Sequence, residues 1–91
     1  MYEVNDMYFA AVLFAYNAAY AGVDRADKRN QKFLFEKNVD IKKIYIEKHG
    51  IVDEIDNPTF EMIQSAYDTV TLLYPTNYVE ALRRVKGIIH K

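Results

Sequence analysis

The chain has 91 residues and a formal net charge of −1, which indicates one small domain without a general electrostatic attraction for nucleic acid or lipid. Hydrophobic residues make up 51% and charged residues 27%, a balance that excludes an intrinsically disordered chain. The absence of cysteine excludes a disulfide framework and a thiolate zinc site. We therefore expect a single compact domain over residues 1–91, located in the cytoplasm.

The first predicted element is the apolar run Met7–Ala21. It is shorter than the roughly 20 residues of a membrane span, and the acidic Glu3 and Asp6 before it argue against a signal peptide. We expect a helix here, capped by Asp6 or Asn5 and stopped by Gly22, and no membrane partner. A helix that is apolar on all faces is usually buried in its own fold, but a small domain can hardly cover every side. The apolar run therefore has two interpretations: a helix buried in the core, or a helix that forms an interface with a second copy or another protein.

A hairpin is expected next. Val23–Ala26 and Gln31–Glu36 have the composition of two short strands, and the polar residues 27–30 form the turn between them. Because side chains alternate along a strand, Phe33 and Phe35 should lie on one face.

The second half of the chain is predicted to be mainly helical. Asp40 is a plausible cap for a helix that ends at Gly50, with Ile41, Ile44 and Tyr45 on one face.

A connector follows over residues 51–56. Asn57 then caps a helix with Pro58 at its first position, running to about Asp68. The β-formers in Thr69–Tyr74 predict a third strand.

The last predicted element is a helix opened by Pro75 and Thr76. Apolar residues recur along it at intervals of three and four: Tyr78, Ala81, Leu82, Val85, Ile88 and Ile89. The expected fold class is therefore α+β, with a small antiparallel sheet made of the hairpin plus one short strand and about four helices packed on it.

Both ends of the chain resemble an uncharacterised family of small phage and mobile-element proteins. Its members open with a motif like Asp-Leu-Tyr-Leu-Ala-Ala, continue with a glycine and a short hairpin, and end in a Pro-x-x-Tyr-x-x-Ala-Leu helix. The matching positions here are Asp6, Tyr8, Ala10, Ala11, Gly22, Phe33, Phe35, Pro75, Tyr78, Ala81, Leu82 and Lys86. The resemblance implies a phage or mobile-element setting, hence a host cytoplasm, and supplies no activity. Residues 38–57 are then expected to be a family-variable insertion.

Catalytic chemistry has little support in the sequence. Ser65 is the only serine, and helix capping or solvent exposure explains His49 and His90 more simply than catalysis does. The acidic run Asp53–Asp56 lacks the spacing of a calcium-binding loop, so a solvated connector explains it better than a hard cation does. We expect no enzyme, no metal site and no cofactor.

Tyrosine is the unusual feature of the composition, with eight residues. Tyr8, Tyr16 and Tyr20 fall in the first predicted helix, and Tyr16 and Tyr20 are one turn apart on one face. Such a stripe is often core, yet aromatic side chains with few rotamers are also typical of interfaces. The first hypothesis is a small accessory protein that binds a protein partner through these three tyrosines, for example to inhibit a host defence or regulatory protein. Homo-oligomerisation is a further expectation.

Basic residues suggest the alternative hypothesis, a nucleic-acid-binding protein. They gather on the hairpin and the last helix: Arg25, Lys28, Arg29, Lys32, Arg83, Arg84 and Lys86. If the two regions lie side by side, these side chains can hold phosphates. Charges on a hairpin also simply keep strand edges from aggregating. A third and weaker hypothesis is a nucleotide-sequestering oligomer with a pocket between copies.

Overall fold

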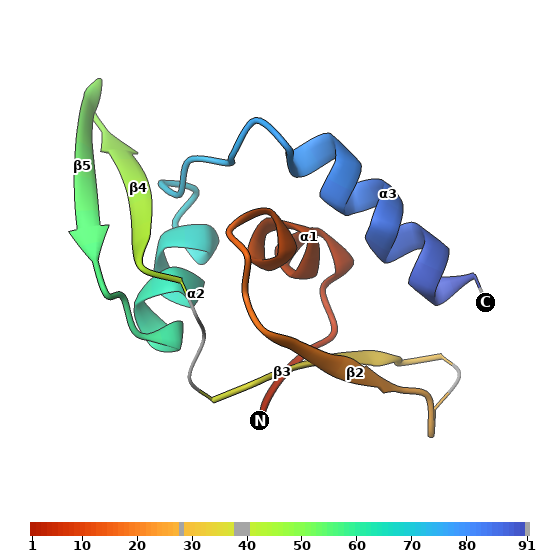
Figure 1. Ribbon diagram of the computed structural model, residues 1–91. Helices are drawn as coiled ribbons and strands as arrows, with labels where there is room; N and C mark the ends of the chain where they lie inside the picture. Colours follow the sequence, from red (N-terminus) through yellow and green to blue (C-terminus); the bar gives the residue numbers. More distant parts are fainter. Residues whose placement is uncertain (28, 38–40, 91) are drawn as a thin grey trace.

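The computed structural model of the protein describes residues 1–27, 29–37 and 41–90 (Figure 1). The elements in chain order are β1 (Tyr2–Val4), α1 (Met7–Ala15), β2 (Tyr20–Asp24), β3 (Lys32–Phe35), β4 (Lys43–Lys48), β5 (Ile51–Asp56), α2 (Phe60–Asp68) and α3 (Tyr78–Ile89). The expected α+β class is confirmed. The described residues contain three helices, where about four were expected, and two antiparallel sheets instead of one.

The larger sheet has the strand order β1-β3-β2, with both neighbours antiparallel to β3. The predicted hairpin is therefore confirmed as β2 and β3, whereas β1 was not foreseen. Phe33 and Phe35 of β3 are both buried on the same face, as the strand alternation predicted. Figure 1 shows α1 above this sheet and α3 on the other side of α1, so the helix lies between two layers. We call the three-stranded sheet, α1 and α3 the body.

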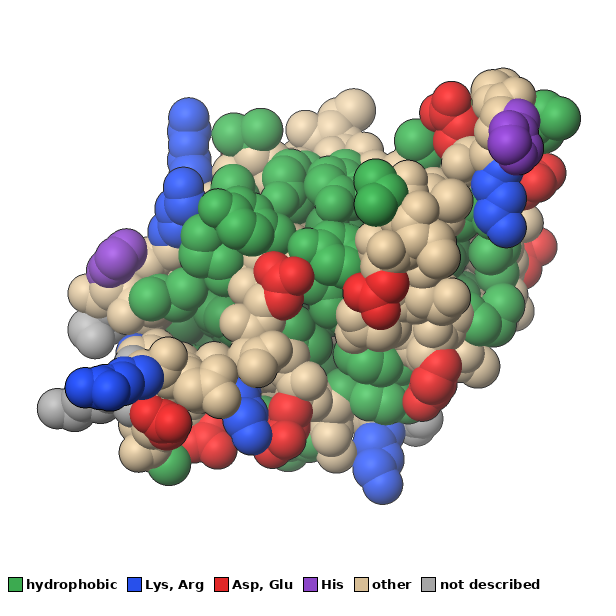
Figure 2. Space-filling view, turned by 180° about the vertical axis from the view of Figure 1, so that it is seen from behind, with side chains coloured by type: hydrophobic (Ala, Val, Ile, Leu, Met, Phe, Trp, Pro, Cys, Tyr) green, Lys and Arg blue, Asp and Glu red, His purple; other side chains and the backbone are tan. Residues whose placement is uncertain are grey.

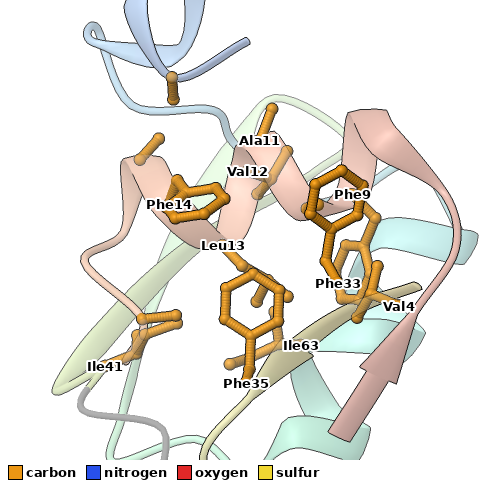
Figure 3. Packing of buried hydrophobic residues seen from close by; sticks show 14 of the residues in the cluster. Val4, Phe9, Ala11, Val12, Leu13, Phe14, Phe33, Phe35, Ile41 and Ile63 are labelled. Atoms are coloured by element: carbon orange, nitrogen blue, oxygen red, sulfur yellow. The ribbon is translucent and has the colours of Figure 1, made fainter. Parts of the chain in front are cut away.

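The first helix is a core helix that is buried from Phe9 to its end, while Tyr8 in its first turn is exposed. Asp6 caps it, as predicted, by accepting hydrogen bonds from the backbone N–H groups of Tyr8 (2.9 Å) and Phe9 (3.3 Å). Every residue from Phe9 to Ala15 is buried, and Figure 3 shows Phe9 and Leu13 among the phenylalanines of the sheet. The protein's own sheet and α3 thus cover this helix, which favours the core interpretation.

The end of α1 differs from the prediction. The helix stops at Ala15 and not at Gly22, because Asn17 adopts a left-handed conformation with φ of 67°. The N–H of Ala18 then donates to the Leu13 carbonyl at 2.9 Å, which closes the helix end. Gly22 lies instead in β2, next to an irregularity in its pairing with β3.

Residues 41–56 form a hairpin where a helix and a connector were expected, and this prediction was wrong. Lys48 pairs with Ile51 across a two-residue turn in which His49 and Gly50 have φ of 53° and 80°. Two consecutive positive φ values are those of the tight turn that matches the twist of two strands. The expected cap Asp40 lies outside the described residues. The hairpin falls within residues 38–57, and the expectation that these residues are a family-variable insertion stays a prediction.

The predicted helices that follow are present with corrected starts. The hydroxyl of Thr59, and not Asn57, caps α2 by accepting from the N–H of Met62 at 3.2 Å. Pro58 consequently precedes the helix. Instead of a third strand over Thr69–Tyr74, the structure has a single bridge between Leu72 and Ile46 of β4.

The last helix follows the predicted periodicity. Ala81 and Val85 of α3 are buried, and the remaining predicted apolar positions, Tyr78, Leu82, Ile88 and Ile89, pack partly buried against the same cluster. One hydrophobic cluster runs from Val4 to Val85 and includes Ile44 of the hairpin, so the core connects both sheets.

Candidate partner-binding surface

Four tyrosines from separate segments meet on one surface around the start of α1. The hydroxyl of Tyr67 donates to the Asp6 carboxylate at 2.9 Å, its ring stacks with Tyr74 at 6.5 Å, and Tyr74 meets Tyr78 at 4.7 Å. Tyr8 is linked to this group through Asp6, whose carboxylate also accepts a hydrogen bond from the backbone N–H of Tyr8 at 2.9 Å. Tyr8 and Tyr74 are each about half exposed, at 49% and 48%. We call Tyr8, Tyr67, Tyr74 and Tyr78 the tyrosine cluster.

The hydroxyls of Tyr67, Tyr74 and Tyr78 are held in the neutral form. Burial raises the pKa of Tyr67 well above its usual range, and the hydrogen bond to the Asp6 carboxylate raises it further. Burial likewise raises the pKa of Tyr74 and Tyr78, followed by the negative charges nearby. At neutral pH the cluster therefore presents apolar rings together with hydroxyls that can donate and accept hydrogen bonds.

An open groove of about 720 Å³ adjoins the cluster and shares Tyr74 with it. The end of α1, the start of β4 and residues 73–76 form its walls, and Tyr16, Tyr45 and Pro75 are among its apolar lining residues. The Tyr16 hydroxyl donates to the Leu73 carbonyl and accepts from the N–H of Tyr45 at 3.4 Å. Burial raises the pKa of Tyr16, so this hydroxyl stays neutral and ties the hairpin to the body.

Figure 2 shows how side chains are distributed on one whole face of the molecule. Side chains of the hydrophobic class, in which tyrosine is included, form a broad area across its middle, between α3 and the β4–β5 hairpin, and acidic side chains lie within this area. Lysine and arginine side chains gather at the margins. A continuous apolar area with polar atoms in and around it is typical of an interaction surface.

The structure places the three predicted tyrosines in different surroundings. Tyr8 is exposed at the start of α1, as a contact residue must be. Tyr16 follows the end of the helix, and Tyr20 lies in β2, where it packs against Phe14 at 4.9 Å and Phe35 at 5.9 Å. The predicted stripe of Tyr16 and Tyr20 on one helical face therefore does not exist, because the helix ends before either residue.

Sequence reasoning missed the contribution of Tyr67, Tyr74 and Tyr78 to the cluster. Their positions before and at the start of the last helix gave one local signal, since Tyr74 and Tyr78 are four residues apart around Pro75. The hydrogen bond from Tyr67 to Asp6 joins residues 61 positions apart, which no local pattern indicates.

The basic residues of the hairpin and of α3 are partly brought together. Arg25 donates to the Ile88 carbonyl and to Gln31 at 3.1 Å, so the β2–β3 turn lies beside the end of α3. Arg29 shares a small hollow with Ile89. The side-by-side arrangement required for a joint basic patch is thus present.

Several of these basic groups already have partners. Lys32 lies 3.7 Å from Glu3, and the guanidinium of Arg84 lies 4.6 Å above the ring of Phe14. Arg83 and Lys86 are exposed on α3, and Lys28 lies outside the described residues. Much of the predicted basic set is therefore used within the fold.

The acidic run of β5 does not converge on one point. Successive side chains of a strand alternate between its two faces, so the Asp53 side chain lies on one face of β5 and those of Glu54 and Asp56 lie on the other. Among residues 1–27, 29–37 and 41–90, no group of three His, Asp or Glu side chains is placed to hold a metal ion. His49 lies in the β4–β5 turn and not at a helix end, and Ser65 lies within α2.

Among residues 1–27, 29–37 and 41–90, no helix has the length and apolar character needed to cross a bilayer.

Comparisons of the chain with protein-family models, with curated proteins and with solved structures find no match. The function is therefore proposed from the geometry of this chain.

Proposed function

We propose that this protein is a small non-enzymatic binding protein that holds a protein partner on the tyrosine cluster and the adjoining groove. The observation that carries this proposal is the meeting of four tyrosines from three separated segments at one surface around Asp6. Tyrosine is favoured at interfaces because it offers a large ring, a hydroxyl and few rotamers to lose.

The cluster has the properties that make contact residues effective. The rings of Tyr67, Tyr74 and Tyr78 already contact one another, so ordering these three side chains on binding would cost little entropy. The groove beside Tyr74 has the size to take an apolar anchor from a partner, which is the usual centre of a strong protein interface.

The setting of this function follows from the family resemblance and is part of the proposal. Phage and mobile elements encode small accessory proteins, and a host defence or regulatory protein is the partner that such a setting suggests. The partner would contact Tyr8 and Tyr74 directly, since these are the two half-exposed members of the tyrosine cluster.

The proposal is tested by quantitative affinity capture followed by binding measurements with the purified candidate. The double variant Tyr8→Ala/Tyr74→Ala removes the two exposed rings, and Met62→Ala/Val70→Ala removes two exposed apolar side chains elsewhere as a matched control. We expect the partner to bind the control variant like the wild type and to bind the tyrosine variant at least about tenfold more weakly. Equal binding to both variants would refute the tyrosine surface.

A second candidate function, nucleic-acid binding, is favoured by the contact of Arg25 with the end of α3, which sets the β2–β3 turn beside that helix. It predicts anisotropy changes with DNA or RNA that diminish steeply as salt increases. Arg29→Ala/Lys86→Ala should then abolish binding, while Lys42→Ala should not. This candidate would be eliminated if the affinity were independent of salt and the Arg29→Ala/Lys86→Ala variant bound like the wild type. The same measurement with a labelled mononucleotide tests the nucleotide-sequestering hypothesis.

A further inference from the structure

The outer edge of β5 is an open strand edge. In an antiparallel hairpin, alternate residues exchange backbone hydrogen bonds with the partner strand. Lys48 and Ile51 flank the two-residue turn and form a hydrogen-bonded pair. Just after β5, the N–H of Asn57 donates to the Lys42 carbonyl at 2.7 Å. Asn57 is an even number of residues from Ile51, so both belong to the same alternating set of hydrogen-bonded residues. The backbone groups that point toward β4 are therefore those of Ile51, Asp53 and Ile55.

The backbone N–H and C=O groups of Val52, Glu54 and Asp56 consequently point away from β4. Within the described part of the chain, no hydrogen bond satisfies them. All three residues are exposed. They form a row of donors and acceptors at the strand spacing, which is the template that an added strand requires.

The opposite edge of the same hairpin shows what a covered edge looks like. The N–H of Glu47 donates to the Thr71 carbonyl at 2.8 Å, and the Tyr45 carbonyl accepts from Leu73 at 2.8 Å. The outer edge of β4 is thus closed by the segment before α3, whereas no segment of residues 1–27, 29–37 and 41–90 pairs with the outer edge of β5.

The charge of β5 selects among the possible occupants of this edge. Asp53, Glu54 and Asp56 are exposed carboxylates, and Lys43 is the cation that pairs with two of them, at 2.9 Å from Glu54 and 3.6 Å from Asp56. A second copy of β5 would be repelled, because an antiparallel pair centred on Asp53 or on Glu54 sets that carboxylate opposite itself. Like charges directly opposite in a sheet are destabilising.

We propose that the open edge of β5 binds an extended basic segment of a protein partner as an additional strand. Lysine or arginine side chains of that segment would lie opposite the carboxylates, and apolar side chains would lie beside the exposed Ile51 on one face of the sheet and the exposed Val52 on the other. This site is distinct from the tyrosine cluster and does not depend on the function proposed for it.

The test uses the full chain and a fluorescent peptide with the sequence Thr-Lys-Val-Lys-Lys-Val-Thr. We expect saturable binding, and we expect amide hydrogen exchange of Val52, Glu54 and Asp56 to slow several-fold at saturating peptide. The amides of Asp53 and Ile55, already bonded within the hairpin, should change far less. Binding without this alternating protection, or no binding at low salt, would overturn the proposal.

Two matched controls separate strand addition from charge attraction. The same peptide with N-methylated backbone amides keeps every charge but loses its donors, and it should bind at least tenfold more weakly. Asp53→Asn/Asp56→Asn should weaken the unmodified peptide, while Glu61→Gln on α2 should not. The Tyr8→Ala/Tyr74→Ala variant should bind the peptide like the wild type, so that failure at β5 is distinguishable from failure of the tyrosine surface. Equal binding of the methylated peptide would refute strand addition.

Discussion

The body and the β4–β5 hairpin differ sharply in how they use their residues. In the body, seven consecutive residues of α1 are buried between a sheet and a helix. In the hairpin, five of the six residues of β5 are exposed. Burial of apolar area is the main favourable contribution to folding, so we infer that the body supplies most of the stability. The hairpin is correspondingly free to present backbone and side chains for contact.

The largest expected effect comes from a substitution in the centre of the body. Leu13→Ala removes a side chain that is fully buried in α1, and it should lower the free energy of unfolding by about 2–5 kcal/mol. Val52→Ala on the half-exposed hairpin should change it by less than about 0.5 kcal/mol. Denaturant titrations followed by circular dichroism measure both, and equal losses would contradict the division into body and hairpin.

A smaller effect is expected where the two regions are joined. Tyr16→Phe removes the hydroxyl that bonds to the Leu73 carbonyl and the Tyr45 N–H, and it should cost about 1–2 kcal/mol. Tyr20→Phe is the control, because no hydrogen bond of the Tyr20 hydroxyl is found among the described residues. Amide exchange should also increase in β4 only for Tyr16→Phe. If both variants behave alike, this hydroxyl does not hold the hairpin.

The tyrosine cluster predicts a loss of stability at alkaline pH. The pKa of Tyr67 is raised from its ordinary value of 10.0 in the folded state, so the unfolded chain releases this proton at lower pH than the native protein does. The stability is therefore complete below about pH 10 and decreases as the pH rises above it. Unfolding midpoints from neutral to alkaline pH should decline less steeply for Tyr67→Phe. An unchanged slope would show that this tyrosine ionises alike in both states.

The smallest effect belongs to the ion pairs on the outer face of the hairpin. The ammonium of Lys43 is in contact with solvent. Its hydrogen bond to Glu54 raises its pKa, and the negative charges of Glu54 and Asp56 raise it further. Because exposed pairs are screened by salt, Lys43→Met should lower the melting temperature only slightly at low ionic strength and not at all near 1 M salt. Lys42→Met serves as the control. A large decrease that persists at high salt would mean that the hairpin matters more to stability than its exposure indicates.

Much of the body could be predicted from the sequence because its signals are local. The cap at Asp6, the alternation of Phe33 and Phe35 and the period of α3 are each set by neighbours within a few residues. β1 was missed because three residues carry no periodicity, and they become a strand only through pairing with β3.

The hairpin could not be predicted because its pattern fits two periods. Ile41, Ile44 and Tyr45 have helical spacing, while Ile44 and Ile46 alternate as in a strand. The strand pairing depends on a turn in which His49 and Gly50 both have a positive φ, a conformation that is uncommon outside glycine. The strand structure of β4 also depends on its pairing with Ile51–Asp56, whose composition indicated a polar connector.

The candidate site was only partly accessible from the sequence. Tyr8 was identified, but the rest of the cluster is assembled by contacts between the start of α1, the end of α2 and the start of α3. Such contacts depend on the complete fold. The placement of Tyr20 on the first helix failed for a local reason, since Asn17 ended that helix five residues before Gly22.

The position of α1 in the chain has a consequence for the order in which the protein can fold during synthesis. This helix emerges from the ribosome before the elements that cover its apolar surface, which are β3 and α3 with its buried Val85. A growing chain therefore carries an uncovered hydrophobic segment until α3 has been made, and such a segment favours association with other chains. Refolding yield should accordingly decrease as protein concentration increases. Among the helices of the described residues, α1 is synthesised first, and its covering is complete only when α3 has been synthesised.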